Sequence, residues 1–163
     1  MKILFIFLIT VQFSWAQNLL DHKLYDPLAN AGMDINAAIK KAQQENKHVL
    51  IQVGGNWCKW CVEFNRFCKG DSQIDSILAK DFIVYHLNYS KENKNEKILA
   101  TYGFPQRFGF PVFIILDEGG NKIHTQNSSY LEDHESYSKI KVFEFLKQWT
   151  KTAVSPETYQ IKK

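Results

Sequence analysis

The chain has 163 residues, of which 45% are hydrophobic and 14% aromatic, and a formal net charge of +3. This length and composition suit one domain with a substantial core and exclude a largely disordered chain. Acidic and basic residues are mixed along the sequence, and N-terminal processing would remove only one charge, that of Lys2. Because the net charge is small and the charges are mixed, we expect no nucleic acid or other acidic polymer as a partner.

Residues 1–16 have the pattern of a secretory signal peptide. Lys2 is followed by an apolar run over residues 3–13, and small residues, Ser14 and Ala16, occupy the positions that signal peptidase reads. We expect cleavage after Ala16 and a periplasmic or secreted protein. The run is shorter than the ~18–20 apolar residues that span a bilayer, so no membrane span is expected after cleavage.

Hydrophobic periodicity predicts the elements of the mature chain. Apolar residues at three- and four-residue spacing predict helices over 34–46, 58–70, 72–79, 96–102 and 140–149. Short apolar runs predict strands over 48–53, 82–87, 112–116 and 122–125. Asp34 is the expected N-cap of the first helix. The turn over 117–121 makes the last two strands antiparallel, so the order predicts an α/β domain with a mixed sheet between helices.

The predicted helices and strands divide the chain into four segments. After the signal peptide, residues 17–33 read as an extension laid on the domain, with no chemical feature of their own. The domain itself is expected over residues 34–151, and residues 152–163 are expected to form a flexible tail.

The three cysteines, Cys58, Cys61 and Cys68, would lie in a compartment where disulfides persist. On a helix, Cys61 and Cys68 are ~10 Å apart, beyond the ~4.4–6.8 Å between Cα atoms that a disulfide allows. The geometry therefore predicts that Cys58 and Cys61 form the pair. Cys68 shares its apolar spacing with Phe64, which favours a buried, inert thiol over a regulatory or dimer-forming one.

The cysteine pair follows a predicted buried strand that ends at Gly54-Gly55, and it opens a predicted helix. The N–H groups at such a helix start favour a thiolate, and Cys58, beside Lys59, is better placed for this than Cys61.

The motif Trp57-Cys58-Lys59-Trp60-Cys61, with Phe110-Pro111 directly before a predicted strand, resembles the thioredoxin superfamily over about residues 34–151. Within it, the chain is most similar to small secreted or periplasmic thioredoxin-like, thiol:disulfide interchange proteins. The resemblance implies a thioredoxin-like fold, with a central mixed β-sheet flanked by helices in three α/β/α layers. It also implies a redox site that uses no dissociable cofactor.

The resemblance assigns a role to each residue of the motif. It implies that Cys58 is the exposed nucleophile, that Cys61 is the resolving thiol and that Pro111 is a cis-proline facing the disulfide. A substrate chain would pair with the backbone of Phe110, and Trp57 would flank the site. The expected substrate-binding residues are Trp57, Lys59, Trp60, Phe110 and Pro111.

Two positions depart from the family pattern. Gln52 stands six residues before Cys58, where many relatives carry a buried carboxylate. An amide cannot take a proton from Cys61, so the resolving step needs water or another base, such as Glu63. Lys59-Trp60 replaces the familiar Gly-Pro between the cysteines.

Two functions fit these observations. The first is an exported thiol–disulfide oxidoreductase that acts on cysteine-containing envelope or secreted proteins and is recycled by a redox partner. The second is a non-catalytic binding module that uses the groove around Trp57, Trp60, Phe110 and Pro111, and Gln52 favours it. In the loop before Pro111, Phe104, Arg107 and Phe108 either shape specificity or pack the loop.

Two structural roles for the cysteines carry less weight. A purely structural disulfide is disfavoured because so short a loop constrains the unfolded chain little. A zinc site is disfavoured because the histidines are dispersed, at positions 22, 48, 86, 124 and 134.

Overall fold

The computed structural model describes residues 23–160, so the expected signal peptide lies outside the described residues. Its α-helices are α1 (Ala31–Glu45), α2 (Lys59–Gly70), α3 (Ser72–Asp81), α4 (Glu96–Thr101), α5 (Lys139–Gln148) and α6 (Lys151–Val154). Its strands are β1 (His48–Gly54), β2 (Phe82–Asn88), β3 (Val112–Leu116), β4 (Lys122–Asn127), β5 (Glu132–Asp133) and β6 (Ser136–Tyr137). Short 3-10 helices are η1 (Pro105–Phe108), η2 (Ser128–Leu131) and η3 (Pro156–Tyr159).

The main sheet has the strand order β2-β1-β3-β4. Strand β1 pairs parallel to β2 and antiparallel to β3, and β3 pairs antiparallel to β4. The expected mixed sheet is therefore confirmed. Every residue of β1 is buried, because this strand has neighbours at both edges and helices over both faces.

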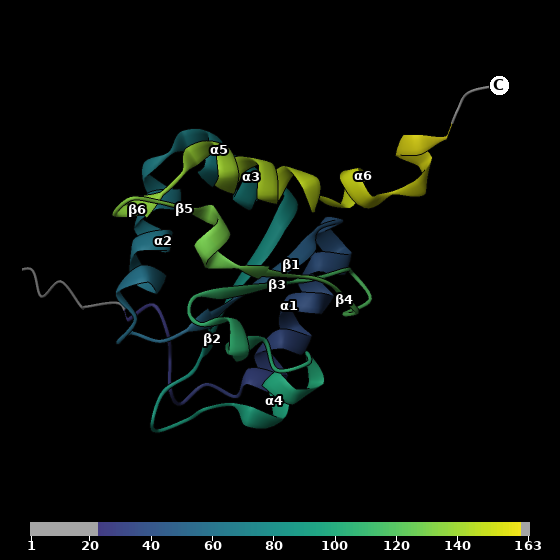
Figure 1. Ribbon diagram of the computed structural model, residues 1–163. Coiled ribbons are helices and arrows are strands. Elements are labelled where there is room, and N and C mark those ends of the chain that lie inside the picture. Colours follow the sequence, from purple (N-terminus) through teal and green to yellow (C-terminus); the bar gives the residue numbers. More distant parts are fainter. Residues whose placement is uncertain (1–22, 161–163) are drawn as a thin grey trace, which may run out of the picture.

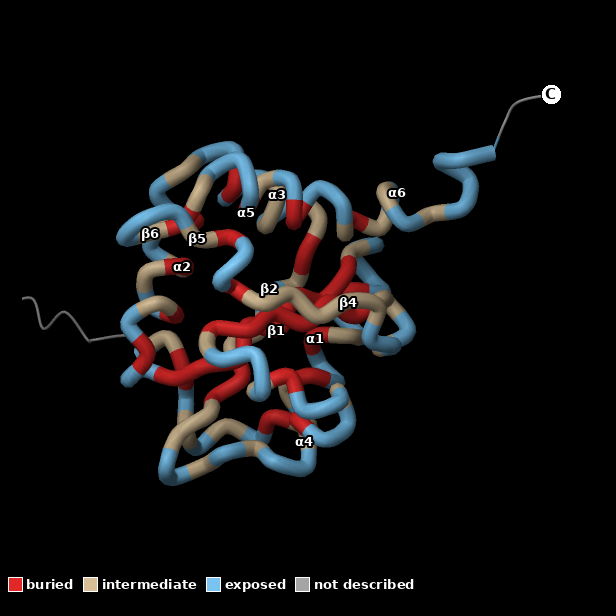
Figure 2. The backbone as a smooth tube through the Cα atoms, in the orientation of Figure 1, coloured by how far each residue is buried: buried red, intermediate tan, exposed pale blue. Residues whose placement is uncertain are grey.

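Side chains alternate across the sheet and build two cores, one on each face. Figure 1 shows α1 and α4 over one face of the sheet and α2, α3 and α5 over the other. The first lies against α1 and α4 and contains, among others, Ile35, Val49, Ile51, Leu99 and Ile114. The second lies against α2, α3 and α5 and contains, among others, Leu50, Phe64, Ile74, Phe113 and Leu146. Figure 2 shows the buried backbone concentrated along the central strands. This is the expected three-layer α/β/α arrangement.

Helix α1 begins earlier than its sequence pattern indicates. Its N-cap is Asn30, whose side-chain oxygen accepts a hydrogen bond from the Met33 N–H at 3.2 Å. The prediction of Asp34 as the cap is therefore wrong. Asp34 instead lies in the first turn, where a carboxylate stabilises the positive end of the helix dipole.

The polar stretch before α5 contains structure that its sequence does not reveal. Strand β4 continues to Asn127, and η2 then leads into the hairpin β5–β6. From this hairpin the Tyr137 hydroxyl donates to the Trp60 carbonyl oxygen at 3.1 Å, and the Tyr137 ring packs against Phe64. The hairpin thereby holds the start of α2. Strands of two residues are too short for a periodic signal, so the pattern could not predict them.

The C-terminal segment expected to be a flexible tail contains α6 and η3, which Figure 1 shows leading away from the sheet. In residues 23–160 no helix combines the length and the apolar character needed to span a bilayer.

Two residues of α5 test how the helix is held. Leu146 is fully buried, whereas Ile140, an expected core position, is 75% exposed. We expect Leu146→Ala to lower the free energy of unfolding by about 2–5 kcal/mol, because it leaves a cavity in the second core. The matched Ile140→Ala variant should stay within about 0.5 kcal/mol of the wild type. Urea unfolding measures both, and equal losses would contradict this packing.

Candidate active site

The strand-to-helix junction places both cysteines at the start of α2. Cys58 is the N-cap, and its sulfur accepts a hydrogen bond from the Cys61 N–H at 3.2 Å. The two residues form a disulfide with a Cα–Cα distance of 5.2 Å, which confirms the predicted pair. After reduction, the same helix N–H groups face the Cys58 sulfur, which favours the thiolate at Cys58.

The cysteines are more enclosed than expected. Cys61 is fully buried, and Cys58, expected to be an exposed nucleophile, is only 6% exposed. They are covered because the following residues pack around them: Leu24, Tyr25, Trp60 and Phe110. Cys58 remains the more exposed residue of the two, so the order of attack implied by the resemblance is compatible with the structure.

An aromatic surface borders the cysteines. The Phe110–Pro111 peptide bond is cis, as expected, and Phe110 packs against the cysteine cluster. The Trp57 ring meets Phe110 edge-on at 5.4 Å between centroids, and its indole N–H donates to the Tyr89 carbonyl oxygen at 2.7 Å. Trp57 is 59% exposed. The structure thus brings Trp57, Phe110 and Pro111 together beside the disulfide.

The two residues between the cysteines face different surroundings. Lys59 is exposed. Trp60 is half-buried, and its ring packs edge-on against Tyr137 with centroids 5.5 Å apart. Trp60 is therefore anchored by the β5–β6 hairpin, and only part of its side chain is exposed.

Both candidate partners for the Cys61 thiol make hydrogen bonds to other groups. The Gln52 amide is buried and donates to the Cys61 carbonyl oxygen at 2.9 Å, so it holds the helix start in place. The Glu63 carboxylate accepts two hydrogen bonds from Arg66, each at 2.8 Å, and one from the Ser136 hydroxyl at 2.7 Å. The Arg66 hydrogen bond is the main reason that the Glu63 pKa is lowered, which keeps this group charged.

The loop before Pro111 combines packing with exposed aromatic rings. Arg107 donates to the carbonyl oxygens of Gly103 and Phe104, and its guanidinium lies 4.2 Å from the centre of the Phe108 ring. Phe104 and Phe108 are 57% and 40% exposed. Arg107 therefore stabilises the loop, and the two phenylalanines face solvent.

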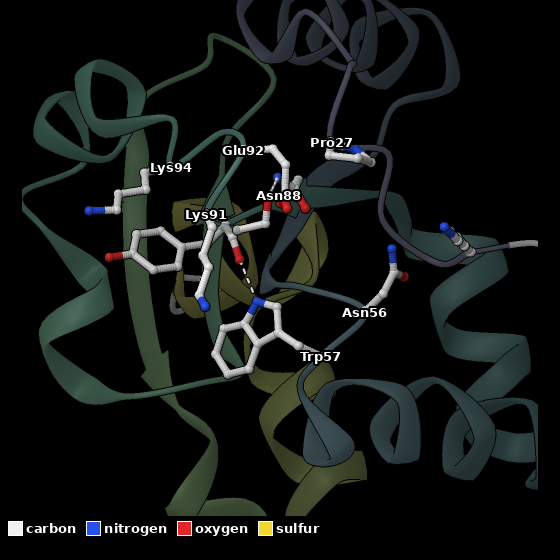
Figure 3. Close-up of a pocket in the computed structure, with 10 residues that line it drawn as sticks. Pro27, Asn56, Trp57, Asn88, Lys91, Glu92 and Lys94 are labelled. Carbon is white, nitrogen blue, oxygen red and sulfur yellow. Dashed lines mark hydrogen bonds between the residues drawn. The ribbon is translucent and has the colours of Figure 1, made fainter.

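A pocket of about 500 Å³ adjoins Trp57 on the side away from α2 (Figure 3). Its walls come from the extension, the β1–α2 turn and the loop after β2. The charged residues that line it are Lys23, Lys91, Lys94 and Glu92. Three of these four charged residues are lysines, so the charge at the pocket is mainly positive.

Tyr25 is a residue of the site that the sequence did not point to. It belongs to the extension, yet it is fully buried against both cysteines. Its backbone N–H donates to the Asn56 side chain at 3.0 Å, and the Asn56 amide donates back to the Tyr25 carbonyl oxygen at 2.7 Å. A single aromatic residue before Asp26-Pro27 carries no periodic signal, so only the tertiary contacts reveal it.

Cys68 is free and 3% exposed, as predicted for a buried thiol. Burial raises the pKa of Cys68 to about 12. Within residues 23–160, no three His, Cys, Asp or Glu side chains gather closely enough to hold a metal ion.

The burial of Cys68 predicts selective labelling. In the reduced native protein at pH 8, iodoacetamide should modify Cys58 first and leave Cys68 unmodified, because only the thiolate reacts. Peptide mass spectrometry after a timed quench measures this, and the urea-unfolded protein, in which all three cysteines should react, is the control. Native labelling of Cys68 at the rate of Cys58 would contradict the described packing.

His86 lies beside the site, with its ring edge-on to Tyr25 at 5.5 Å between centroids. Burial, assisted by Lys69, lowers the pKa of His86 to about 4. An unfolded histidine titrates near ~6.5 and binds the proton first, so stability should be complete above ~6.5 and fall by about 2–3 kcal/mol as the pH drops to ~4. Urea unfolding of His86→Phe across this range should lack that contribution. The exposed-site control His134→Asn should retain it, and identical pH profiles for all three proteins would contradict the assignment.

A family model described as thioredoxin-like matches residues 29–118. The chain is 24% identical over 107 residues to the thiol:disulfide interchange protein DsbD of Yersinia pestis, a match that covers 66% of this chain and 17% of that protein. The chain thus spans about a sixth of the length of these curated relatives.

Solved structures share the fold. The disulphide isomerase from Xylella fastidiosa Temecula1 superposes with a TM-score of 0.67 at 22% identity, covering 76% of this chain and 94% of that one. The oxidised C-terminal domain of DsbD from Neisseria meningitidis gives a TM-score of 0.51 at 17% identity, covering 72% and 94%. With the mixed sheet, the cysteine pair at the start of α2 and the family match over residues 29–118, the chain belongs to the thioredoxin-like family.

Proposed function

We propose that the protein is an exported thiol–disulfide oxidoreductase that exchanges disulfides with protein substrates. The observation that carries the proposal is the Cys58–Cys61 disulfide at the N-terminus of α2, with Cys58 as the N-cap and the more exposed residue of the pair. The names of the similar proteins, a thiol:disulfide interchange protein and a disulphide isomerase, agree with this chemistry.

The exchange runs in two steps that balance in atoms and electrons. In the reducing direction, the Cys58 thiolate attacks a substrate disulfide, forms a mixed disulfide and releases one substrate thiolate. The Cys61 thiolate then attacks the Cys58 sulfur, which releases the second substrate thiolate and leaves the Cys58–Cys61 disulfide. The reverse sequence oxidises a substrate dithiol. Reduction potentials of such sites range from roughly −270 to −120 mV, and this potential decides the direction.

The surface around the pair supports a polypeptide substrate. Trp57 and Phe110 present aromatic rings beside Cys58, and the expected partner chain would lie along Phe110 and Pro111. The signal-peptide pattern in residues 1–16 directs the proposal to cysteine-containing envelope or secreted proteins. Turnover then requires a further redox protein that returns the pair to its starting state.

Serine variants test the division of labour between the cysteines. Cys58→Ser should abolish dithiothreitol-linked insulin reduction and trap no mixed disulfide, because the attacking sulfur is gone. Cys61→Ser should also lose turnover but accumulate a mixed disulfide at Cys58, visible on non-reducing gels.

The control for this experiment is Cys68→Ala, which removes the third thiol without touching the site and should keep the wild-type rate. Full activity in both serine variants would rule out the proposed function.

A non-catalytic binding module remains the competing function, since Gln52 provides no base for the resolving thiol. Equilibration with glutathione buffers separates the two functions. A catalyst should titrate between about −300 and −100 mV, whereas a pair that never titrates in this range serves as a structural link.

A further inference from the structure

The Tyr25 hydroxyl is an isolated polar group in the middle of the site. The residue is fully buried, and its hydroxyl has no hydrogen-bond partner among residues 23–160. A buried hydroxyl without a partner destabilises a fold, and native proteins contain few of them. The presence of a hydroxyl at this buried position therefore needs an explanation beyond packing.

The space beside Gly54 shows which groups the Tyr25 hydroxyl faces. A Cβ atom placed on Gly54 would collide with the Cys61 sulfur and would lie 2.8 Å from the Tyr25 hydroxyl oxygen. The phenol oxygen and the resolving sulfur therefore border the same small space, which exists because residue 54 has no side chain. The Gln52 amide, which donates to the Cys61 carbonyl oxygen, also lies near the phenol oxygen, and a donor there leaves the phenol hydrogen free.

The surroundings keep the phenol in place and protonated. The paired hydrogen bonds between Tyr25 and Asn56 fix the backbone, and His86 supports the ring edge-on. Burial raises the pKa of Tyr25 far above its usual range, so the hydroxyl stays protonated at physiological pH and can donate a hydrogen bond.

The other titratable groups near the site do not compete for this role. His86 is neutral at physiological pH, since burial lowers its pKa to about 4. The Glu63 carboxylate is engaged by Arg66 and Ser136, and the Tyr137 hydroxyl donates to the Trp60 carbonyl oxygen. Lys59 is exposed at the first position of α2. Tyr25 is thus a buried hydroxyl beside the Cys61 sulfur whose hydrogen is not engaged elsewhere among residues 23–160.

We infer that the Tyr25 hydroxyl donates a hydrogen bond to the Cys61 sulfur once the disulfide is reduced, and that it thereby stabilises the resolving thiolate. This inference deepens the proposed function and rests on it, because it assigns a positioning residue to the second step. A disulfide sulfur is a weak acceptor and a thiolate a strong one, so the donor gains its partner only in the reduced protein. It therefore favours the reduced state and lowers the pKa of Cys61.

The Tyr25→Phe variant removes the hydroxyl and keeps the ring. The redox equilibrium, in which the dithiol and oxidised glutathione give the protein disulfide and two reduced glutathiones, should shift about tenfold toward the disulfide. A tenfold shift equals a reduction potential about 30 mV lower. In a Cys58→Ser background, the acid dissociation constant of Cys61 should fall about tenfold, measured by the pH dependence of its Cβ ¹³C chemical shift.

Tyr85→Phe is the matched control. Tyr85 is half-buried against the first core, the one beneath α1 and α4, and its hydroxyl donates to Asp34 at 3.3 Å. This variant loses a hydroxyl of the same kind, so any effect of general destabilisation appears in it as well. Its glutathione equilibrium and its Cys61 titration should match the wild type.

A folded Tyr25→Phe protein with an unchanged equilibrium and an unchanged Cys61 titration would overturn the inference. If Tyr25→Phe does not fold, 3-fluorotyrosine at position 25 replaces it, since the more acidic phenol is a stronger donor of nearly the same shape. The pKa of Cys61 should then fall, and no change would again overturn the inference. Both readouts use the cysteine pair alone, so failure of substrate exchange would contradict the proposed function without touching this result.

Discussion

The close contact between the end of β1 and the start of α2 determines the geometry of the site. The buried central strand β1 ends at Gly54, and α2 begins at Lys59 after a short turn, with Cys58 as its N-cap. A Cβ on Gly54 would collide with the Cys61 sulfur, and one on Gly55 would lie 2.8 Å from the Tyr89 carbonyl oxygen. The helix can therefore approach the strand because Gly54 lacks a side chain, and the turn can pass close to Tyr89 because Gly55 lacks one.

The electrostatics of the site follow from this junction. The backbone N–H of Cys61, in the first turn of α2, donates to the Cys58 sulfur. The side chains of Gln52 and Glu63 make hydrogen bonds to other groups. The aromatic cover of Tyr25, Trp60 and Phe110 keeps the sulfurs largely out of water. In such an environment a helix end and a single hydroxyl have a larger effect than they would at an exposed site.

The secondary structure was predictable where the signal is local and periodic. The apolar residues of β1 and β3 indicated buried strands, and the spacing of Cys61, Phe64 and Cys68 indicated the inner face of α2. The predictions failed where one side chain or a very short element decides the structure. Asn30 rather than Asp34 caps α1, and the hairpin that carries Tyr137 follows no hydrophobic pattern.

The chemistry of the site could be predicted from the sequence: two cysteines at disulfide spacing, a helix start that favours the thiolate, and a distant proline before a strand. These features depend on residue identity and local spacing, which a linear sequence states directly. The exposure of Cys58 and the groups that surround Cys61 could be read only from the folded structure. Tyr25 lies 36 positions before Cys61 in the chain. Burial and side-chain contacts over such separations depend on how the extension packs against the sheet and α2, and no local pattern records that packing.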